Sequence, residues 1–385
     1  MNCTMIFGGD IAPLRAEPMG MFGNLVPVIQ QADLALANLE IALSKRGRPI
    51  RGKPIAHTGP PEAIEGLREA GFDAFNLANN HILDFGEEPL LDTLETLHAA
   101  GLGMFGAGRN AAAAAAPYVT ERKGIKIGLL GYTPTLPQGF EAGVNSPGVN
   151  PLRVRTAYRP LRNLDEYPGT EPIIDTWPVE DDLRRMCEDV ASLRKRVNIL
   201  LVYQHWGSSI TERVHEFQKV IGRTAIDCGA DAVFGGHQHL ISAIEFYREK
   251  PIIYGMGNLL FDIKAPFLTE ITHRTFLFGA RMAKKLKLPE SRVVIPSRLS
   301  LAARRRLRFL DDKWCPSWIG GQKGDARCDV NCDDWTDPPL REATTLECYR
   351  RSHKIALAEL DAANRACPTR RLKTKTAPRF SPGAA

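Results

Sequence analysis

The sequence predicts an α/β domain in which helices cover a layered β-sheet. Residues 125–130 and 198–203 are near-continuous apolar runs, which are typical of strands buried on both faces. Residues 90–100 carry apolar side chains at helical spacing and stop at Gly101, a common helix end. Because such strands and helices alternate from residue 3 to about 290, a layered α/β fold is expected.

The other expected elements follow the same two patterns. Short apolar runs predict strands, and amphipathic segments that stop at Gly71 and Gly229 predict helices. In chain order we expect strands at 3–7, 34–39, 74–77, 231–234, 241–246 and 251–254, and helices at 61–70 and 217–228.

Composition and charge limit the class of protein. The chain has 385 residues, of which 44% are hydrophobic and 24% charged, so a fibrous or wholly disordered chain is excluded. Residues 1–300 carry 33 basic and 33 acidic side chains, whereas residues 301–385 carry 17 against 11, so the net charge of +6 lies in the tail. We therefore predict one domain over 1–300 and a basic, cysteine-containing, partly disordered appendage over 301–385.

Targeting signals and cysteine usage predict the compartment. No stretch approaches the ~18 apolar residues of a transmembrane helix, and the first residues lack the basic region of a signal peptide, so no membrane anchor is expected. The eight cysteines are scattered, which predicts reduced thiols in a cytoplasmic protein.

The tail offers two further candidate functions, and its sequence favours neither. The spacing of its cysteines fits paired zinc ligands poorly. Its arginines accompany no nucleic-acid-binding module, so no nucleic-acid partner is expected.

Residues 133–180 interrupt the alternation and are rich in proline and glycine. An insertion of this kind is either a lid or substrate-binding loop, or a plain surface excursion. Three of its arginines, Arg153, Arg155 and Arg159, are candidates for binding an anionic substrate, because guanidinium groups match carboxylates and phosphates. The alternative for these arginines is a solvated basic face.

Polar side chains follow successive predicted strands at their carboxyl ends, where α/β sheets bind ligands. Any one of them is more often a satisfied polar residue than a ligand, but the full set is hard to assign to chance. Carboxylate, amide and imidazole groups together suit Mn²⁺, Fe²⁺ or Zn²⁺, and their number allows one or two ions. A histidine beside the ligands would serve as general acid. The residues are Asp10, Asn38, Glu40, Asn80, His81, His205, His237 and His239.

These segments resemble the CapA family of poly-γ-glutamate capsule synthesis proteins, whose domain is similar to the calcineurin-like metallophosphoesterases. The resemblance covers about residues 3–280 and implies a layered metallophosphoesterase-like sheet core with flanking helices. The motifs occur in the family's order: Gly9-Asp10, Asn38-Leu39-Glu40, Asn79-Asn80-His81 with Asp84-Phe85-Gly86, His205-Trp206-Gly207, Gly235-Gly236-His237-Gln238-His239, and Tyr254-Gly255-Met256-Gly257-Asn258 with Phe261-Asp262.

The resemblance also implies a role for each site residue. His81, oriented by Asp84, would be the general acid. Asn258 is a candidate substrate contact, because the glycines before it would allow a substrate to approach closely, and the alternative for this segment is a tight turn at a strand end. The pattern departs at Ala12, where the phosphoesterases carry a histidine, so the first metal site lacks one ligand. The implied metal ligands are Asp10 and His239 for one ion, Asn80, His205 and His237 for the other, and Glu40 as the bridge.

Two functions of different class follow. One is a metal-dependent hydrolase that cleaves a phosphoester or a γ-glutamyl amide through a metal-bound hydroxide. The other is a non-catalytic capsule component that binds an anionic polymer during assembly or export. The expected partner is in both cases an anionic small molecule or polymer, glutamyl or phosphorylated, and the sequence indicates no oligomeric state. The ligand set favours the enzyme, and the missing histidine at position 12 favours the binder.

Overall fold

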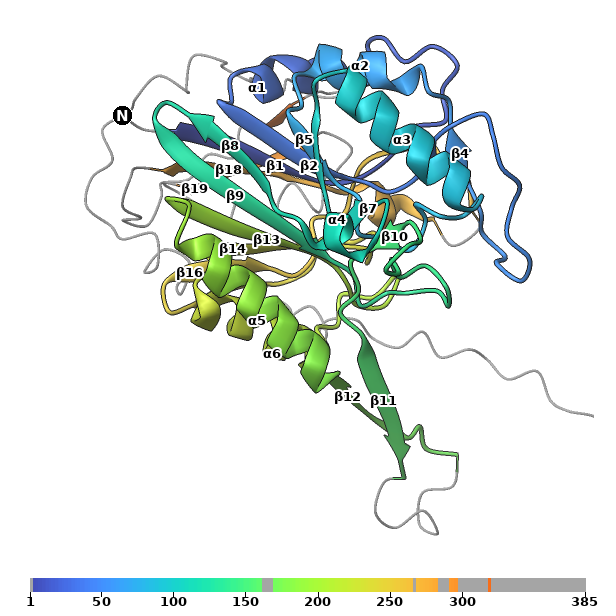
Figure 1. Ribbon diagram of the computed structural model, residues 1–385, viewed down its shortest axis with the longest axis vertical. Helices are drawn as coiled ribbons and strands as arrows, with labels where there is room; N and C mark the ends of the chain where they lie inside the picture. Colours follow the sequence, from blue (N-terminus) through green and yellow to red (C-terminus); the bar gives the residue numbers. More distant parts are fainter. Residues whose placement is uncertain (1–2, 161–168, 266–267, 283–290, 297–317, 320–385) are drawn as a thin grey trace, which may run out of the picture.

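Two β-sheets packed face to face form the centre of the computed structural model, which describes residues 3–160, 169–265, 268–282, 291–296 and 318–319 (Figure 1). Helices cover the outer face of each sheet, so the layers run helix, sheet, sheet, helix. The predicted layered α/β core, with sheets covered by flanking helices, is therefore confirmed. Among the described residues no helix is long and apolar enough to cross a membrane.

The first sheet contains β1 (Cys3–Ala12), β2 (Leu34–Leu39), β5 (Ala74–Asn76), β6 (Gly103–Phe105), β17 (Asn258–Phe261), β18 (Leu277–Met282), β19 (Ser291–Pro296) and β20 (Trp318–Ile319). Its order is β20-β19-β18-β1-β2-β5-β6, and β17 pairs with β1. Strands β1, β2, β5 and β6 are parallel, whereas β18 runs antiparallel to β1. The three strands expected in the first 80 residues are thus neighbours in one sheet.

The second sheet contains β8 (Tyr118–Arg122), β9 (Ile125–Tyr132), β13 (Ile199–His205), β14 (Ala232–Gly236), β15 (Ile244–Tyr247) and β16 (Lys250–Ile253). Its order is β15-β16-β14-β13-β9-β8, with parallel strands inside and an antiparallel strand at each edge. The two near-continuous apolar runs of the sequence analysis form β9 and β13, which are adjacent and, apart from Lys126, buried, as expected for central strands.

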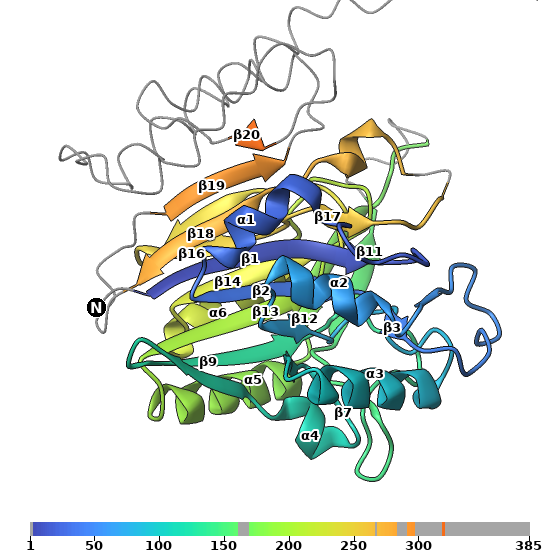
Figure 2. The same ribbon diagram turned by 90° about the horizontal axis from the view of Figure 1, so that it is seen from above.

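Five helices supply the outer layers. Helices α1 (Val26–Gln30), α2 (Ala63–Ala70) and α3 (Glu87–Ala99) pack on the first sheet, and α5 (Glu180–Arg194) and α6 (Glu216–Cys228) pack on the second (Figure 2). Between the sheets the rings of Phe7 and Phe234 stack with centroids 3.9 Å apart. Burying an aromatic side chain of this kind stabilises a fold by roughly 1.5–3 kcal/mol, so this inner layer ties the two sheets together.

The remaining elements lie in connections. They are the strand pairs β3 (Ala42–Leu43) with β4 (Thr58–Gly59), β7 (Ala107–Gly108) with β10 (Gly148–Val149), and β11 (Val154–Arg159) with β12 (Ile173–Pro178), helix α4 (Ala111–Ala115), and 3-10 turns at Gly23–Leu25 and Glu270–His273. The expected insertion at 133–180 contains β10 and the β11–β12 hairpin, which projects from the body of the molecule (Figure 1). Its boundaries as a lid stay a prediction.

Two cysteines correct the prediction that all thiols are reduced. Cys187 of α5 and Cys228 of α6 form a disulfide that joins the two helices over the second sheet. The prediction missed this pairing because α5 itself was not predicted, so nothing in the sequence placed Cys187 beside Cys228. Cys3 is a free, buried cysteine, and the five cysteines from Cys315 onward lie outside the described residues.

A close approach of two backbones turns the end of β1 toward the second sheet. The register of β1 against β2 shifts between Phe7 and Asp10, and Asp10 N–H donates to the carbonyl of Gly257 at 3.0 Å. A Cβ at position 9 would lie only 1.9 Å from that carbonyl oxygen, so only glycine fits at Gly9. The Gly9-Asp10 motif therefore has a structural reason, which is to bring Asp10 to the shared edge of the sheets.

Candidate metal centre

A buried cluster of carboxylates and imidazoles lies where strands of both sheets end. The ligating atoms of Asp10, Glu40 and His205 all lie within 4.8 Å of one another, and these side chains are fully buried. The His237 ring, which follows β14, lies 4.9 Å from the His205 ring and 6.0 Å from the His239 ring. Asn80 joins them through its contact with His205, so the structure brings all six predicted metal ligands into one cluster, and their role as ligands stays a prediction.

Glu40 is the most unusual member of this cluster. Both of its carboxylate oxygens are buried, and when the group is ionised neither oxygen accepts a hydrogen bond from a donor among the described residues. Its Oε1 lies 3.9 Å from His205 Nε2 and 3.8 Å from His239 Nε2, too far for a hydrogen bond. Burial, and then the nearby charge of Asp10, raise the pKa of Glu40 well above its ordinary value. An ionised carboxylate in this position is therefore strongly disfavoured unless a cation joins it.

Asp10 is held by two amide donors. Its Oδ1 accepts a hydrogen bond from Asn38 Nδ2 at 2.9 Å, and its Oδ2 accepts one from the backbone N–H of His237 at 3.0 Å. Asn38 is itself fixed, because its Oδ1 accepts from Asn76 Nδ2 at 2.8 Å. Burial raises the pKa of Asp10 despite these donors. Asn38 thus serves to orient Asp10, and it connects the first two strand ends.

His205 and Asn80 face each other across the two sheets. His205 Nε2 lies 2.8 Å from Asn80 Oδ1, and its Nδ1 lies 3.3 Å from Asn38 Nδ2. Burial and the neighbouring histidines lower the pKa of His205 well below its ordinary range. The ring is therefore neutral at pH 7, which is the state that binds a metal.

The glycine pair before His237 lets the backbone turn back over the cluster. His237 and His239 both have positive φ, +85° and +56°, which is rare for residues other than glycine and costs about 1–3 kcal/mol each. A Cβ at Gly236 would lie 2.5 Å from Asp10 Oδ1, so this position must stay free of a side chain. The strained turn aims both rings inward, and His237 Nδ1 is buried there without a partner.

Asn258 contacts a histidine of the cluster. Its Oδ1 lies 2.8 Å from His239 Nδ1, and its Nδ2 donates to the carbonyl of Thr272 at 3.1 Å. Because the amide oxygen of Asn258 can only accept a hydrogen bond, His239 must carry its proton on Nδ1. The Nε2 atom on the side of Glu40 is then unprotonated. The structure therefore shows Asn258 as a residue that orients His239, whereas the sequence predicted it as a substrate contact.

His81, Asp84 and a lysine form a second charged group beside the cluster. His81 Nδ1 lies 2.7 Å from Asp84 Oδ2, as expected for a histidine oriented by that aspartate. Lys53 Nζ donates to the other oxygen of Asp84 and to the carbonyl of Asn80, and lies 3.1 Å from His81 Nδ1. Sequence reasoning missed Lys53, because it lies in a loop with four other cations and belongs to no recognised motif.

Ala12 faces an apolar surface. It is fully buried and clusters with Ile41 and Ile263, with Phe261 packed against them. Phe261 also meets the His239 ring edge-on at 4.9 Å. The place of the missing histidine is thus filled by hydrophobic side chains, so among the described residues nothing replaces that ligand from this direction.

The predicted substrate-binding arginines already have carboxylate partners or lie on the projecting hairpin. Arg153 binds Asp182 of α5 through Nε at 2.7 Å and Nη2 at 2.8 Å. Arg159 Nε pairs with Asp175 of the facing strand at 2.5 Å, and Arg155 lies opposite Trp177 in the same ribbon. Arg153 and Arg159 therefore already contact carboxylates of the hairpin and of α5, and their role in substrate binding stays a prediction.

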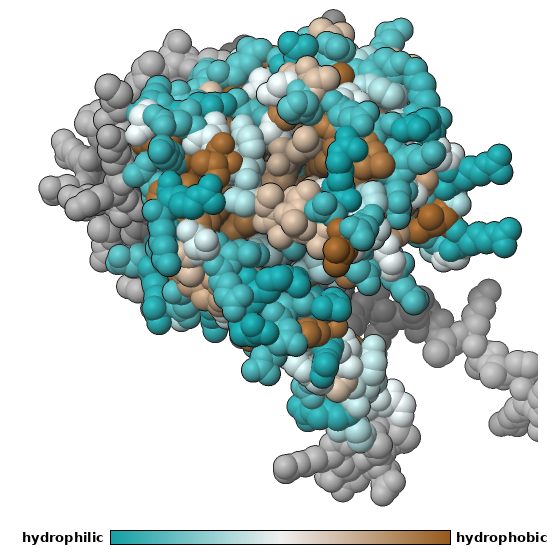
Figure 3. Space-filling model, in the orientation of Figure 1, coloured by the Kyte–Doolittle hydropathy of each residue, from teal (hydrophilic) through white to brown (hydrophobic). Residues whose placement is uncertain are grey.

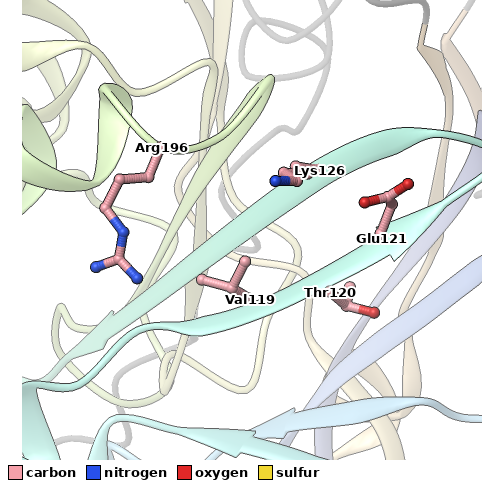
Figure 4. Close-up of a pocket in the computed structure, with 5 residues that line it drawn as sticks. All are labelled: Val119, Thr120, Glu121, Lys126 and Arg196. Atoms are coloured by element: carbon pink, nitrogen blue, oxygen red, sulfur yellow. The ribbon is translucent and has the colours of Figure 1, made fainter.

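An open depression with a volume of about 520 Å³ lies elsewhere on the second sheet (Figure 4). It is lined by Val119, Thr120 and Glu121 of β8, with Lys126 and Arg196 beside them. Lys126 is near the start of β9, whereas the metal cluster lies at the carboxyl ends of the strands. This depression is therefore separate from the candidate centre.

The donor set fits a divalent transition metal. Two buried carboxylates, neutral imidazoles and an amide oxygen are the ligands that Mn²⁺, Fe²⁺ and Zn²⁺ accept. The orphaned oxygens of Glu40 and the orphaned Nδ1 of His237 are unsatisfied without such an ion. The cluster therefore could hold a metal, and its identity is not indicated by the geometry.

Fold and site together define a layered α/β protein with a buried carboxylate–imidazole cluster at the carboxyl ends of its strands. A family model described as "Bacterial capsule synthesis protein PGA_cap" matches residues 4–263. The chain belongs to this family.

Individual relatives agree with this assignment. The chain is 26% identical over 244 residues to "PGA biosynthesis protein CapA" of Bacillus subtilis (strain 168), covering 63% of this chain and 57% of that protein. It is 25% identical over 245 residues to "Capsule biosynthesis protein CapA" of Bacillus anthracis, covering 63% and 54%. The chain thus spans about half the length of the curated relatives it matches. Among solved structures, a candidate 5'-nucleotidase from Staphylococcus aureus in complex with alpha-ketoglutarate aligns with a TM-score of 0.42 and 13% identity, over 76% of this chain and 54% of that one.

Proposed function

We propose that this protein is a metal-dependent hydrolase that cleaves a phosphoester or a γ-glutamyl amide in an anionic ligand. The observation that carries the proposal is Glu40, a fully buried carboxylate that, when ionised, has no hydrogen-bond donor at either oxygen. A carboxylate kept in this state costs folding free energy, and a bound divalent cation offsets that cost. A purely structural carboxylate would instead be paired or hydrogen-bonded.

The residues of the cluster have separate tasks around such an ion. Asn258 keeps the proton of His239 on Nδ1, so that Nε2 faces Glu40. Asn38 fixes the orientation of Asp10. When bound, the metal supplies a Lewis acid that polarises the bond under attack and activates water. The residues proposed to hold it are Asp10, Glu40, Asn80, His205, His237 and His239.

His81 is the proposed general acid. Its Nδ1 faces the Asp84 carboxylate at 2.7 Å, which fixes that proton and leaves Nε2 to give a proton to the leaving group. Asp84 pairs with Lys53 as well as with His81, so a positive charge lies beside the aspartate that orients the His81 ring. The His81 side chain is 11% exposed, enough to meet a ligand at the surface of the cluster.

The names of the relatives support the glutamyl side of the substrate proposal. The Bacillus proteins are named for PGA and capsule biosynthesis. The resemblance in the sequence motifs is to proteins of poly-γ-glutamate capsule synthesis, and poly-γ-glutamate is an anionic polymer. Because this chain spans about half of their length, an anionic small molecule or polymer as its partner is a proposal.

A second candidate function is a non-catalytic component that binds an anionic polymer. The observation in its favour is Ala12, whose side chain packs among apolar residues where a phosphoesterase would place a histidine ligand. A centre short of one ligand binds one ion less firmly, and a binding protein tolerates that loss better than a two-metal enzyme.

His81→Ala is expected to leave bound metal unchanged and to lower turnover by roughly 10²–10⁴-fold, the usual contribution of a general acid. Turnover is measured on p-nitrophenyl phosphate, bis-p-nitrophenyl phosphate and γ-glutamyl-p-nitroanilide, with metal content determined on the same samples. His98→Ala is the control, because His98 is exposed on α3. Full activity of the His81 variant would remove this residue from the mechanism, and an inactive but metal-loaded wild type would favour the binding function.

A cytoplasmic location is also part of the proposal, and one feature weighs against it. The Cys187–Cys228 disulfide is of a kind that persists mainly in oxidising compartments. Fractionation of expressing cells, with thiol labelling of the two cysteines, tests the location: an oxidised pair in an exported fraction contradicts it.

A further inference from the structure

The loop between β3 and β4 carries a concentration of positive charge, of which the proposed mechanism uses only Lys53. We call residues 44–57 the cationic loop. It holds five lysine or arginine residues and no aspartate or glutamate, although residues 1–300 as a whole are neutral. The five are Lys45, Arg46, Arg48, Arg51 and Lys53.

Asp84 anchors the cationic loop beside the metal centre. Lys53 Nζ donates to the Asp84 carboxylate and to the carbonyl of Asn80, and the Lys53 side chain is only 13% exposed. On the other side of the loop's turn, the backbone N–H of Ile50 donates to the Asp84 carbonyl at 3.0 Å. Arg51 lies between these two anchor points, so it is held next to the segment that carries Asn80.

The cations of the loop divide into paired and unpaired ones. Lys45 pairs with Glu62, and Arg46 pairs with Asp92 of α3. Arg48 and Arg51 are exposed, and within the described residues no carboxylate or hydrogen-bond partner contacts either side chain. Two guanidinium groups of the cationic loop are thus left facing solvent.

The outer surface of the molecule agrees with a solvent-facing position of the cationic loop. In Figure 1 the cationic loop is the blue segment that extends beside β4. Figure 3 shows hydrophilic side chains projecting from the same edge of the molecule, beyond the mixed surface of the body.

We propose that Arg48 and Arg51 bind anionic groups of the ligand that enters the metal centre. This inference rests on the proposed function for the site, and it moves anion recognition from the arginines of the β11–β12 hairpin to the cationic loop. A guanidinium fork binds a carboxylate or a phosphate through two parallel hydrogen bonds. Two such forks, both unpaired, suit a ligand with several negative charges along its length, which is a polycarboxylate or a polyphosphorylated molecule.

Binding of two defined probes to the full chain tests the proposal. The probes are a fluorescein-labelled γ-linked glutamate decamer and unlabelled tripolyphosphate, measured by anisotropy and by calorimetry at low ionic strength. Arg48→Gln/Arg51→Gln is compared with Lys45→Gln/Arg46→Gln, which removes the same charge from the same loop but takes cations that already have carboxylate partners. Metal content is determined on all three proteins.

The expected result is that removing Arg48 and Arg51 weakens binding of at least one probe by roughly tenfold, while the Lys45 and Arg46 variant changes it less than about twofold. Loss confined to the decamer assigns a polycarboxylate, and loss confined to tripolyphosphate assigns a phosphorylated ligand. Equal weakening by both variants, or a wild type that binds neither probe, would overturn the proposal. Selective weakening in protein that holds no metal would support the loop's role and count against the hydrolase.

Discussion

Glu40→Gln is expected to remove the bound metal and, in the metal-free protein, to raise the free energy of unfolding by about 2 kcal/mol at pH 7. Glutamine keeps the shape of the side chain and removes its charge. The buried carboxylate has no hydrogen-bond partner, so the neutral amide costs less to bury than the ion. A substitution that stabilises the empty protein while abolishing metal binding is the signature of a site built for a cation.

The pH dependence of the metal-free protein follows from the same residue. Burial raises the pKa of Glu40 well above its ordinary 4.5, so the folded state holds a proton where the unfolded chain has lost it. Stability from this group is therefore greatest below the unfolded pKa and falls as pH rises toward the folded one. Denaturant unfolding of the metal-free wild type and of Glu40→Gln at several pH values measures this dependence. The free energy of unfolding of the variant is expected to change less with pH.

Lys53→Met is expected to lower the free energy of unfolding by about 3 kcal/mol, because it leaves the fully buried Asp84 carboxylate without its cation. The Asn80 carbonyl loses a donor at the same time. Lys53→Met/Asp84→Asn is expected to recover much of the loss, since both charges are then absent. A denaturant-unfolding cycle over the two residues measures the coupling.

The cycle also distinguishes a buried pair from a surface contact. A lysine at the protein surface would give less than about 1 kcal/mol in the single variant and no recovery in the double variant. That outcome would contradict the anchoring role of Lys53 for the cationic loop.

The fold could be predicted wherever burial leaves a pattern in the sequence. Strands β2, β9 and β13 are continuous apolar runs and were expected within two residues of their bounds. Helix α5 was not predicted, because eight of its fifteen residues are charged and it follows the proline-rich insertion. The expected strand at 241–246 begins instead at Ile244, since residue 241 only forms an isolated bridge with Met256.

The site was predictable to the extent that its residues end strands. Parallel strands bring their carboxyl ends to one edge, which is why Asp10, Glu40 and His205 meet. Partners contributed by loops leave no such pattern. Lys53 reaches Asp84 from a loop 31 positions away, and Arg153 is occupied by Asp182 on the unpredicted helix α5. Both depend on tertiary contacts that spacing along the chain does not encode.

Elemental analysis of bound metal tests the central claim most directly. Protein purified without chelator is compared with the His237→Ala/His239→Ala double variant, which removes both rings of the strained turn. The account predicts at least about one equivalent of Mn, Fe or Zn per chain in the wild type, and none in the variant. Absence of metal from the wild type, even after supplementation with Mn²⁺, Fe²⁺ or Zn²⁺, would contradict it.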